Sequence, residues 1–185
     1  MRIVHAYRYP VDLYDRIWLN YFDNNWSEIA TSRKVDPFSN FEPPTEVMST
    51  AGTPKNENSS MDLNWVSSDS TAQYYYYLHF AELQNLTRNQ YRAFDITLNG
   101  KPWSTTFQVP EKLVSTNVWS LAYSVTGATS YTLSLVKHEN STLPPILNAY
   151  ELYRNQKQIR MMVCYFIILV RGLKFDFILR FGVLK

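Results

Sequence analysis

The sequence has a single cysteine, Cys164, which lies near the C-terminal end of the 185 residues. The chain therefore has no intramolecular disulfide and no zinc site built from several thiolates. Glycine is scarce, with five residues, whereas aromatic residues make up 16% of the chain. Aromatic side chains fit the half-buried surface of a pleated sheet and lose rotamer freedom in helices. This composition favours β structure.

A stripe of basic residues is also missing from the body of the chain, although the formal net charge is +2. Residues 154–185 hold seven basic residues and one acidic residue, which leaves eleven basic and fifteen acidic residues in 1–153. The body therefore carries a mildly acidic charge of about −4. Because nucleic-acid binding requires basic groups that neutralise phosphates, we predict no nucleic-acid partner.

Recognisable catalytic and metal-binding motifs are absent as well. The chain has three histidines and contains neither a G-x-S-x-G nor an H-E-x-x-H pattern. A glycosidase needs two carboxylates about 5 to 10 Å apart, and Glu82, Asp95 and Glu151 are available, but one sequence gives no pairing among them. We therefore predict no catalytic residue, no metal, no cofactor and no enzymatic activity.

The N-terminus shows no apolar signal-peptide segment, since residues 1–8 lead directly into Tyr9-Pro10-Val11-Asp12. On this reading the chain is either cytosolic or lacks its start. Asn-x-Ser/Thr sequons nevertheless indicate the secretory pathway, where N-glycosylation takes place. The candidates for N-glycosylation are Asn25, Asn58, Asn85 and Asn140.

Alternating apolar and polar residues predict strands at 61–66 and 94–98. The second of these runs into Asn99-Gly100, a strong signal for a tight turn between strands. Residues 74–83 are more densely apolar and predict a central strand covered on both faces, with two of its four tyrosine rings on each face. Further strands are predicted at 47–51, 118–125, 131–138 and 147–153. This series, together with long loops in 1–46, favours a β-sandwich or jelly roll.

The tail, residues 154–185, breaks this pattern because it is apolar and basic. Its apolar run at 161–170 has ten residues, whereas a transmembrane helix needs about twenty. Lengthening the run to that size takes in four charged residues, so we predict no true membrane span. We expect the tail to be helical or irregular, to pack poorly on the domain and to be dispensable for folding.

Four ordered motifs resemble the second malectin unit in the malectin-like ectodomain of plant leucine-rich-repeat receptor-like serine/threonine kinases. They lie at 9–18, 77–83, 94–100 and 141–151, and the resemblance covers residues 9–153. It implies a malectin-like β-sandwich preceded by an extension at 1–8. Every kinase motif is absent, so kinase activity is not carried over. The chain is thus expected to be a truncated fragment whose tail is read through from non-coding sequence.

The resemblance also suggests a ligand, because malectin, the animal protein that gives the family its name, binds a glucose disaccharide through aromatic rings and an acidic residue. Sugar rings pack their apolar faces on such side chains. Trp26 and Trp103 lie in polar, loop-like contexts and are the candidate exposed rings for ligand binding. Tyr14 and Trp18 are expected instead to pin the N-terminal segment to the sheet.

The expected function is therefore a non-catalytic, extracellular ligand-binding module at the plasma membrane, as part of a signalling receptor. Its ligand would be a cell-wall carbohydrate or a secreted peptide, and the sister malectin unit of the parent receptor would be its neighbour. The alternative is a purely structural spacer within the ectodomain, or a non-functional gene fragment.

Overall fold

The computed structural model of the chain describes residues 6–21, 23–37, 41, 43–120, 125–155 and 160–166. Strands are the main regular structure of this part, and the helix α1 (Thr45–Met48) is a single turn. The strands are β1 (Ala6–Arg8), β2 (Ile17–Asn20), β3 (Trp26–Ala30), β4 (Thr50–Pro54), β5 (Met61–Val66), β6 (Gln73–Phe80), β7 (Phe94–Leu98), β8 (Lys101–Pro102), β9 (Thr116–Trp119), β10 (Ser130–Lys137), β11 (Ala149–Asn155) and β12 (Arg160–Phe166).

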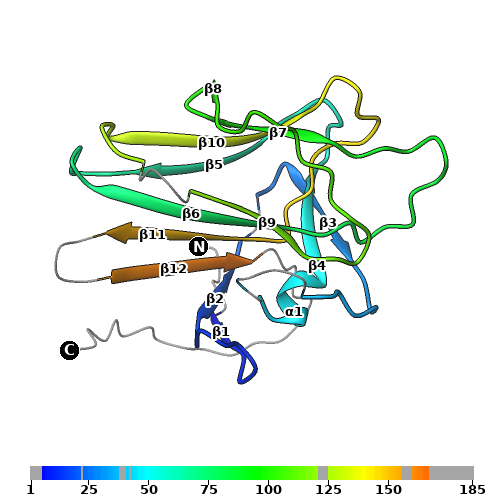
Figure 1. The fold of residues 1–185 in the computed structure, drawn as a ribbon, viewed down its shortest axis with the longest axis horizontal. Helices are drawn as coiled ribbons and strands as arrows, with labels where there is room; N and C mark the ends of the chain where they lie inside the picture. The colour runs from blue at the N-terminus through cyan, green and yellow to red at the C-terminus, as the bar shows by residue number, and fades with distance from the viewer. Residues whose placement is uncertain are drawn as a thin grey trace.

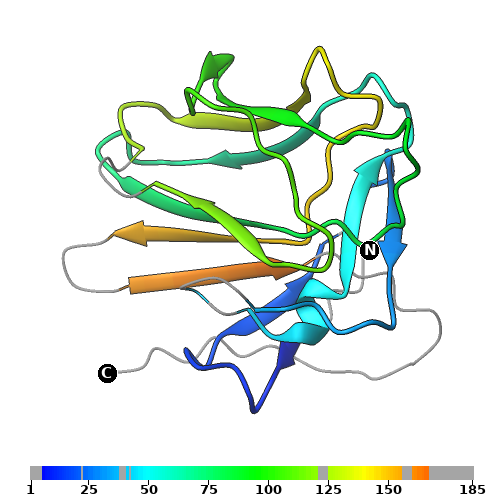
Figure 2. The ribbon, with the colours of Figure 1, turned by 45° about the vertical axis from the view of Figure 1, so that its right-hand side comes forward.

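The strands form two stacked sheets and a smaller third one (Figure 1). A six-stranded sheet in the order β1-β2-β12-β11-β6-β9 faces a four-stranded sheet in the order β5-β10-β7-β8. Strands β3 and β4 pair with each other on the right of Figure 2, beside the ends of the two layers. This arrangement confirms the predicted β-sandwich.

The core lies between the two larger sheets and follows from the alternation of residues along each strand. In β6, Tyr74 and Tyr76 are buried toward the four-stranded sheet, whereas Tyr75 and Tyr77 are half-buried on the other face. The predicted division of the four tyrosines is therefore confirmed. Opposing strands supply the other half of the core, including Met61, Leu63, Phe94, Ile96, Tyr131, Leu133 and Leu135.

The strands with the clearest alternation lie where the sequence predicts them, since β5 and β7 match the predicted bounds. Strands β10 and β11 agree with the predicted 131–138 and 147–153 to within two residues at each end. The predicted strand at 118–125 overlaps β9 (Thr116–Trp119) at two residues only, Val125 forms an isolated bridge with Tyr74, and residues 121–124 lie outside the described part.

The prediction of a strand at 47–51 is wrong, because Val47 and Met48 belong to α1 and β4 begins only at Thr50. Pro44 sets the φ angle that starts the turn, and its carbonyl accepts a hydrogen bond from Met48 N at 3.1 Å. Strand β4 then pairs with β3. All of its residues are buried, so the alternation that would reveal it in the sequence is missing.

The turn between β7 and β8 has the predicted conformation, since Asn99 and Gly100 have φ angles of 50° and 74°. Positive φ at both central positions defines the type I′ hairpin turn.

We expect Gly100→Ala to lower the free energy of unfolding by about 1 kcal/mol, because alanine resists positive φ. An added Cβ would contact nothing within 4 Å, so backbone conformation alone sets the cost. Denaturant unfolding measures this effect, and Lys101→Ala, at an exposed position in the same hairpin, is the control and should change stability by less than about 0.5 kcal/mol.

The tail contributes a strand, so the prediction that it is helical or irregular is wrong for residues 160–166. Strand β12 pairs antiparallel with β11 from Ala149↔Phe166 to Asn155↔Arg160. Its other edge pairs in parallel with β2, so β12 lies inside the six-stranded sheet. The described part of the apolar run therefore lies between β2 and β11. This position exists only because the sheet brings these two distant strands to either side of β12. The rest of the apolar run, residues 167–170, lies outside the described residues.

Candidate ligand-binding site

The acidic residue of the last motif, Glu151, lies in a buried cluster on the outer face of the six-stranded sheet. Arg16 Nη1 donates to its Oε1 at 2.9 Å, and His79 Nε2 lies 2.8 Å from the same oxygen. The hydroxyl of Tyr153 donates to Oε2. Arg16 and Glu151 are each 1% exposed, and His79 is fully buried. These contacts join the three sequence motifs that contain Arg16, His79 and Glu151.

Asp12 completes this cluster from the side of the N-terminal segment. Its carboxylate accepts hydrogen bonds from Arg16 Nε at 3.0 Å, from Trp18 Nε1 at 2.7 Å and from the backbone N–H of Tyr14 at 2.9 Å. Trp18 is fully buried, which confirms it as an anchor of the segment, whereas Tyr14 is 50% exposed with Arg16 Cζ 5.1 Å from its ring centroid, and its anchoring role stays a prediction. Arg16 thus lies between two carboxylates, as a buried charge requires.

The surroundings of Glu151 determine its charge. Burial on its own would raise the pKa of this carboxyl, but the hydrogen bond and charge of His79, the charge of Arg16 and the hydroxyl of Tyr153 together lower the pKa below its ordinary value. A carboxylate held ionised and enclosed in this way is unsuited to act as a general acid. Glu151 is therefore a structural residue.

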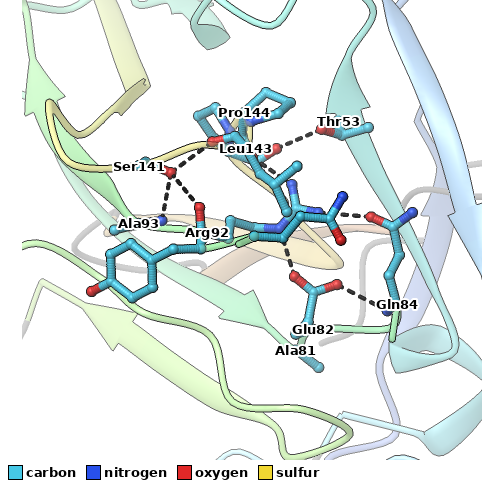
Figure 3. A network of polar contacts seen from close by, with 12 residues as sticks. Thr53, Ala81, Glu82, Gln84, Arg92, Ala93, Ser141, Leu143 and Pro144 are labelled. Carbon is cyan, nitrogen blue, oxygen red and sulfur yellow. Dashed lines mark hydrogen bonds and ion pairs between the residues drawn. The ribbon is translucent and has the colours of Figure 1, made fainter. Parts of the chain in front are cut away.

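A second buried network connects the motif at 77–83 to the Pro144-Pro145 segment (Figure 3). Arg92 Nε donates to Glu82 Oε2 at 2.6 Å, and both side chains are almost fully buried. The same guanidinium donates to the carbonyl of Pro144 and, at 2.8 Å, to Gln84 Oε1. His79 and Glu82 therefore have different partners, in keeping with the prediction that they point to opposite sides of the sheet and form no pair.

Asn148 forms a third buried contact between distant segments. Its amide nitrogen donates to the carbonyls of Met48 at 2.9 Å and Thr50 at 3.1 Å, and its Oδ1 accepts from Ala81 N at 2.7 Å. Asn148 is fully buried. Because the polar residues of the motifs are used to join segments, they are not available to a ligand. Among the described residues, no group of three or more His, Cys, Asp or Glu side chains could hold a metal ion.

A cavity of about 70 Å³ lies between the two larger sheets and differs from the three polar networks in the residues that line it. Its lining is aliphatic and aromatic except for one asparagine, and it comprises Leu63, Asn64, Trp65, Tyr76, Leu78, Leu133, Tyr150 and Leu152. Two polar atoms of this lining, Trp65 Nε1 and Tyr76 Oη, are buried and have no hydrogen-bond partner among the described residues. Burial also raises the pKa of Tyr76, so its hydroxyl stays a donor at all physiological pH values.

Aromatic rings surround this cavity. Trp65 stacks on Tyr131 with a centroid distance of 5.0 Å and an interplanar angle of 13°. Its edge contacts Tyr74 at 6.0 Å. Tyr76 packs on Trp103 at 5.0 Å. The cluster therefore combines stacking surfaces with two unpaired donors, which is the combination that small polar ligands use.

The two tryptophans predicted as exposed rings lie in different environments. Trp26 is 3% exposed and packs on Tyr21 at 5.6 Å, so the prediction of an exposed ring is wrong for it. Its polar neighbours belong to the preceding turn, whereas Trp26 itself begins β3 and faces the core. Trp103 is partly buried and reaches the cavity only through Tyr76. Its ligand-binding role stays a prediction. The sequence does not single out Trp65 as a candidate, because the alternating pattern of its strand indicates only core packing.

The four sequon asparagines are all exposed. Asn58, Asn85 and Asn140 lie in the β4–β5, β6–β7 and β10–β11 connections, which gather at the right-hand end of the sandwich in Figure 1. Asn25 joins them, because its carbonyl accepts from Lys55 N at 2.8 Å. The connections at the opposite end, whose described residues are 67–72, 120 and 125–129, contain no sequon. Glycans on these asparagines would therefore leave one end of the sandwich uncovered.

The sequence matches the model of the malectin-like domain family over residues 2–155, and the chain belongs to this family. It is 38% identical over 149 residues to the LRR receptor-like serine/threonine-protein kinase IOS1 of Arabidopsis thaliana, covering 80% of this chain and 17% of that protein. It is also 38% identical over 147 residues to the probable LRR receptor-like kinase PAM74 of the same plant, covering 79% and 16%. The chain thus spans about one-sixth of the length of these relatives, and the matched region contains no catalytic domain.

Solved structures show the same fold. The chain superimposes on the plant receptor-like kinase ANX1 with a TM-score of 0.61 and 18% identity, covering 76% of this chain and 43% of that one. For the ANX2 ectodomain of Arabidopsis thaliana the TM-score is 0.59, with 18% identity and coverage of 76% and 44%. The resemblance to receptor-kinase ectodomains is therefore confirmed. In the described part of the chain, helices are too short and too polar to cross a membrane.

Proposed function

We propose that this chain is a non-catalytic, extracellular ligand-binding module derived from a receptor-like kinase ectodomain. Its ligand is a cell-wall carbohydrate or a secreted peptide. The proposal is supported by the similarity to receptor-like kinases and by four exposed sequons. Two carboxylates that are almost fully buried, Glu82 and Glu151, are paired with Arg92 and Arg16, which favours binding over catalysis.

The observation that supports this proposal is the aromatic cavity, where we locate the candidate ligand site. Trp65 lies one residue before the end of β5, next to the sequon-free connection at 67–72. The following residue, Val66, is 80% exposed at the same end. Because neighbouring residues of a strand point to opposite faces, Val66 lies on the outer face of its sheet, whereas Trp65 faces the ring cluster between the sheets. Glycans on the four sequons, which lie at the opposite end of the sandwich, would not block a ligand from reaching the ring cluster.

The size of the cavity limits what enters it. Pockets that enclose a whole small molecule have volumes of about 300 to 1,000 Å³, whereas this cavity has about 70 Å³. It therefore admits one small polar group of a ligand, such as a hydroxymethyl group of a sugar or a short peptide side chain. The unpaired Trp65 Nε1 and Tyr76 Oη would donate hydrogen bonds to that group.

Binding of the purified domain to a glycan array and to a library of secreted plant peptides tests this proposal. Tyr76→Phe removes one donor and keeps the ring, so we expect it to weaken binding about 5- to 10-fold, the value of one hydrogen bond. Tyr91→Phe, at the opposite end of the sandwich, is the matched control and should bind like the parent. Trp103→Ala tests the predicted role of Trp103 directly. Binding that is insensitive to both Tyr76→Phe and Trp103→Ala would exclude this site.

A structural role in the ectodomain is the second candidate, and exposed apolar residues near the N-terminus favour it. Val11 and Leu13 are 73% and 69% exposed, and Ile17 is 53% exposed. Such a group is unusual on a free surface and suits packing against a sister malectin unit. The absence of specific binding to either library, from a folded domain, would favour this spacer function.

A further inference from the structure

An exposed apolar patch surrounds one of the four sequons. Phe107, Val109, Val136 and Tyr91 are four of the nine large hydrophobic side chains that are exposed in the described part of the chain. The pairings Val136↔Asp95 and Phe94↔Gln108 bring three of them to the same end of the four-stranded sheet, where β10 ends and β7 begins. Tyr91 joins them, because its backbone is bonded to Thr142 of the sequon Asn140-Ser141-Thr142. We call these four side chains the Asn140 patch.

A fixed aromatic platform lies in this patch. The ring of Phe107 stacks on His138 with a centroid distance of 4.2 Å and an interplanar angle of 23°. His138 Nδ1 lies 2.8 Å from Asp95 Oδ2, which sets the orientation of the imidazole. Phe107 is nevertheless 43% exposed, so one side of the stack is open to solvent.

The sequon is held rigidly beside this platform. Ser141 N donates to the carbonyl of His138 at 2.9 Å, so residues 138–141 form a tight turn with Asn140 in its third position. Ser141 Oγ accepts from Ala93 N at 2.9 Å, and Thr142 Oγ1 accepts from Tyr91 N at 2.7 Å. The Cα atoms that begin and end such a turn lie within about 7 Å of each other. Asn140 is exposed and two residues from His138.

We propose that Asn140 carries an N-linked glycan whose first N-acetylglucosamine packs its apolar face on the Phe107–His138 pair and covers the Asn140 patch. Pyranose rings pack on aromatic side chains in the same way that other apolar surfaces do. The covalent tether removes most of the entropy that a free sugar would lose on binding, so even a weak contact is occupied. The glycan thus covers the exposed apolar surface beside its own sequon.

The connection around Asn58 has no aromatic residue. Asn58 is flanked in its connection by the polar residues 55–57 and 59–60. Asn85 Oδ1 is in contact with Lys112 Nζ. A glycan at Asn58 therefore provides a matched control that is attached to the same sandwich end without an aromatic platform.

The test uses the full chain secreted from a host that makes high-mannose glycans. One variant keeps only Asn140, because Asn25, Asn58 and Asn85 are changed to Gln, and the control variant keeps only Asn58. Intact mass gives occupancy, endoglycosidase H trims each glycan to one sugar, and peptide N-glycosidase F removes it. We expect the full and one-sugar forms of the Asn140 variant to melt at the same temperature, about 2–4 °C above the sugar-free form. The Asn58 variant should show no such difference.

Phe107→Ala, in the variant that keeps only Asn140, should abolish the stabilisation by the first sugar, because the stacking surface is removed. If that variant does not fold, nuclear Overhauser contacts between the acetyl methyl group and the rings of Phe107 or His138 in the unchanged protein decide the question. An unoccupied Asn140 in the secreted protein would overturn the proposal. So would a stabilisation that survives Phe107→Ala, or an absence of these ring contacts. None of these outcomes depends on whether the domain binds an external ligand.

Discussion

Replacing Glu151 by alanine is expected to lower the free energy of unfolding by about 3–5 kcal/mol, the usual cost of breaking a buried ion pair. The change leaves Arg16 with one carboxylate instead of two and His79 without its partner, while both stay buried. Denaturant unfolding of the two chains measures the difference. Glu139→Ala, at an exposed position, is the matched control and should change stability by less than about 0.5 kcal/mol.

The same residue should make stability depend on pH. Because the pKa of Glu151 is lower in the folded protein than its ordinary value, its contribution is fully present above the unfolded pKa and is lost as the pH falls through the folded pKa. The parent chain should therefore lose more stability on acidification than Glu151→Gln, which cannot titrate there. If both chains lose the same stability between neutral and acidic pH, the carboxylate is not held ionised by its neighbours.

Ending the chain at residue 155 is expected to lower the free energy of unfolding on the order of 5 kcal/mol, or to abolish the cooperative transition. Strand β12 is hydrogen-bonded to β11 over seven residue pairs and to β2 over three. Each hydrogen bond lost contributes about 0.5–1.5 kcal/mol. The hairpin of β1 and β2 would also lose the strand that connects it to the sheet.

A chain that ends at residue 166 keeps every described strand and is the matched control for this truncation. The difference between the two melting transitions isolates the contribution of β12. Equal transitions would mean that β12 adds nothing to stability, and the view of the tail as a dispensable segment would then hold.

The sequence predicts strands well where one face is buried and the other is not. In β5 and β7 the alternation is visible in Met61, Leu63 and Ile96, and the bounds agree with the structure. The turn at Asn99-Gly100 is equally readable, because few residue pairs adopt positive φ at two successive positions. Strand β4 could not be predicted from the sequence, because it is buried throughout and contains glycine, proline and threonine.

The candidate site shows the same limit. Trp26 and Trp103 were chosen from their polar neighbours in the sequence, but the direction of a side chain depends on the strand that it joins. Trp26 begins β3 and faces the core, whereas Trp65 lies in an ordinary alternating strand and borders the cavity with an unpaired indole nitrogen. A cavity arises from the spacing of two sheets, and no local pattern encodes that spacing.

By itself, the sequence determined the β-rich class, the order of the motifs, the tight turn at Asn99-Gly100 and the family, because each follows from residue types at short range. Only the tertiary structure decided which residues meet. Arg16 and Glu151 are 135 positions apart, and the ion pair between them forms because β2 and β11 belong to the same six-stranded sheet. Strand order and register are set by the packing of the whole sandwich, so the buried networks, the place of β12 and the gathering of four sequons at one end could not be predicted from the chain alone.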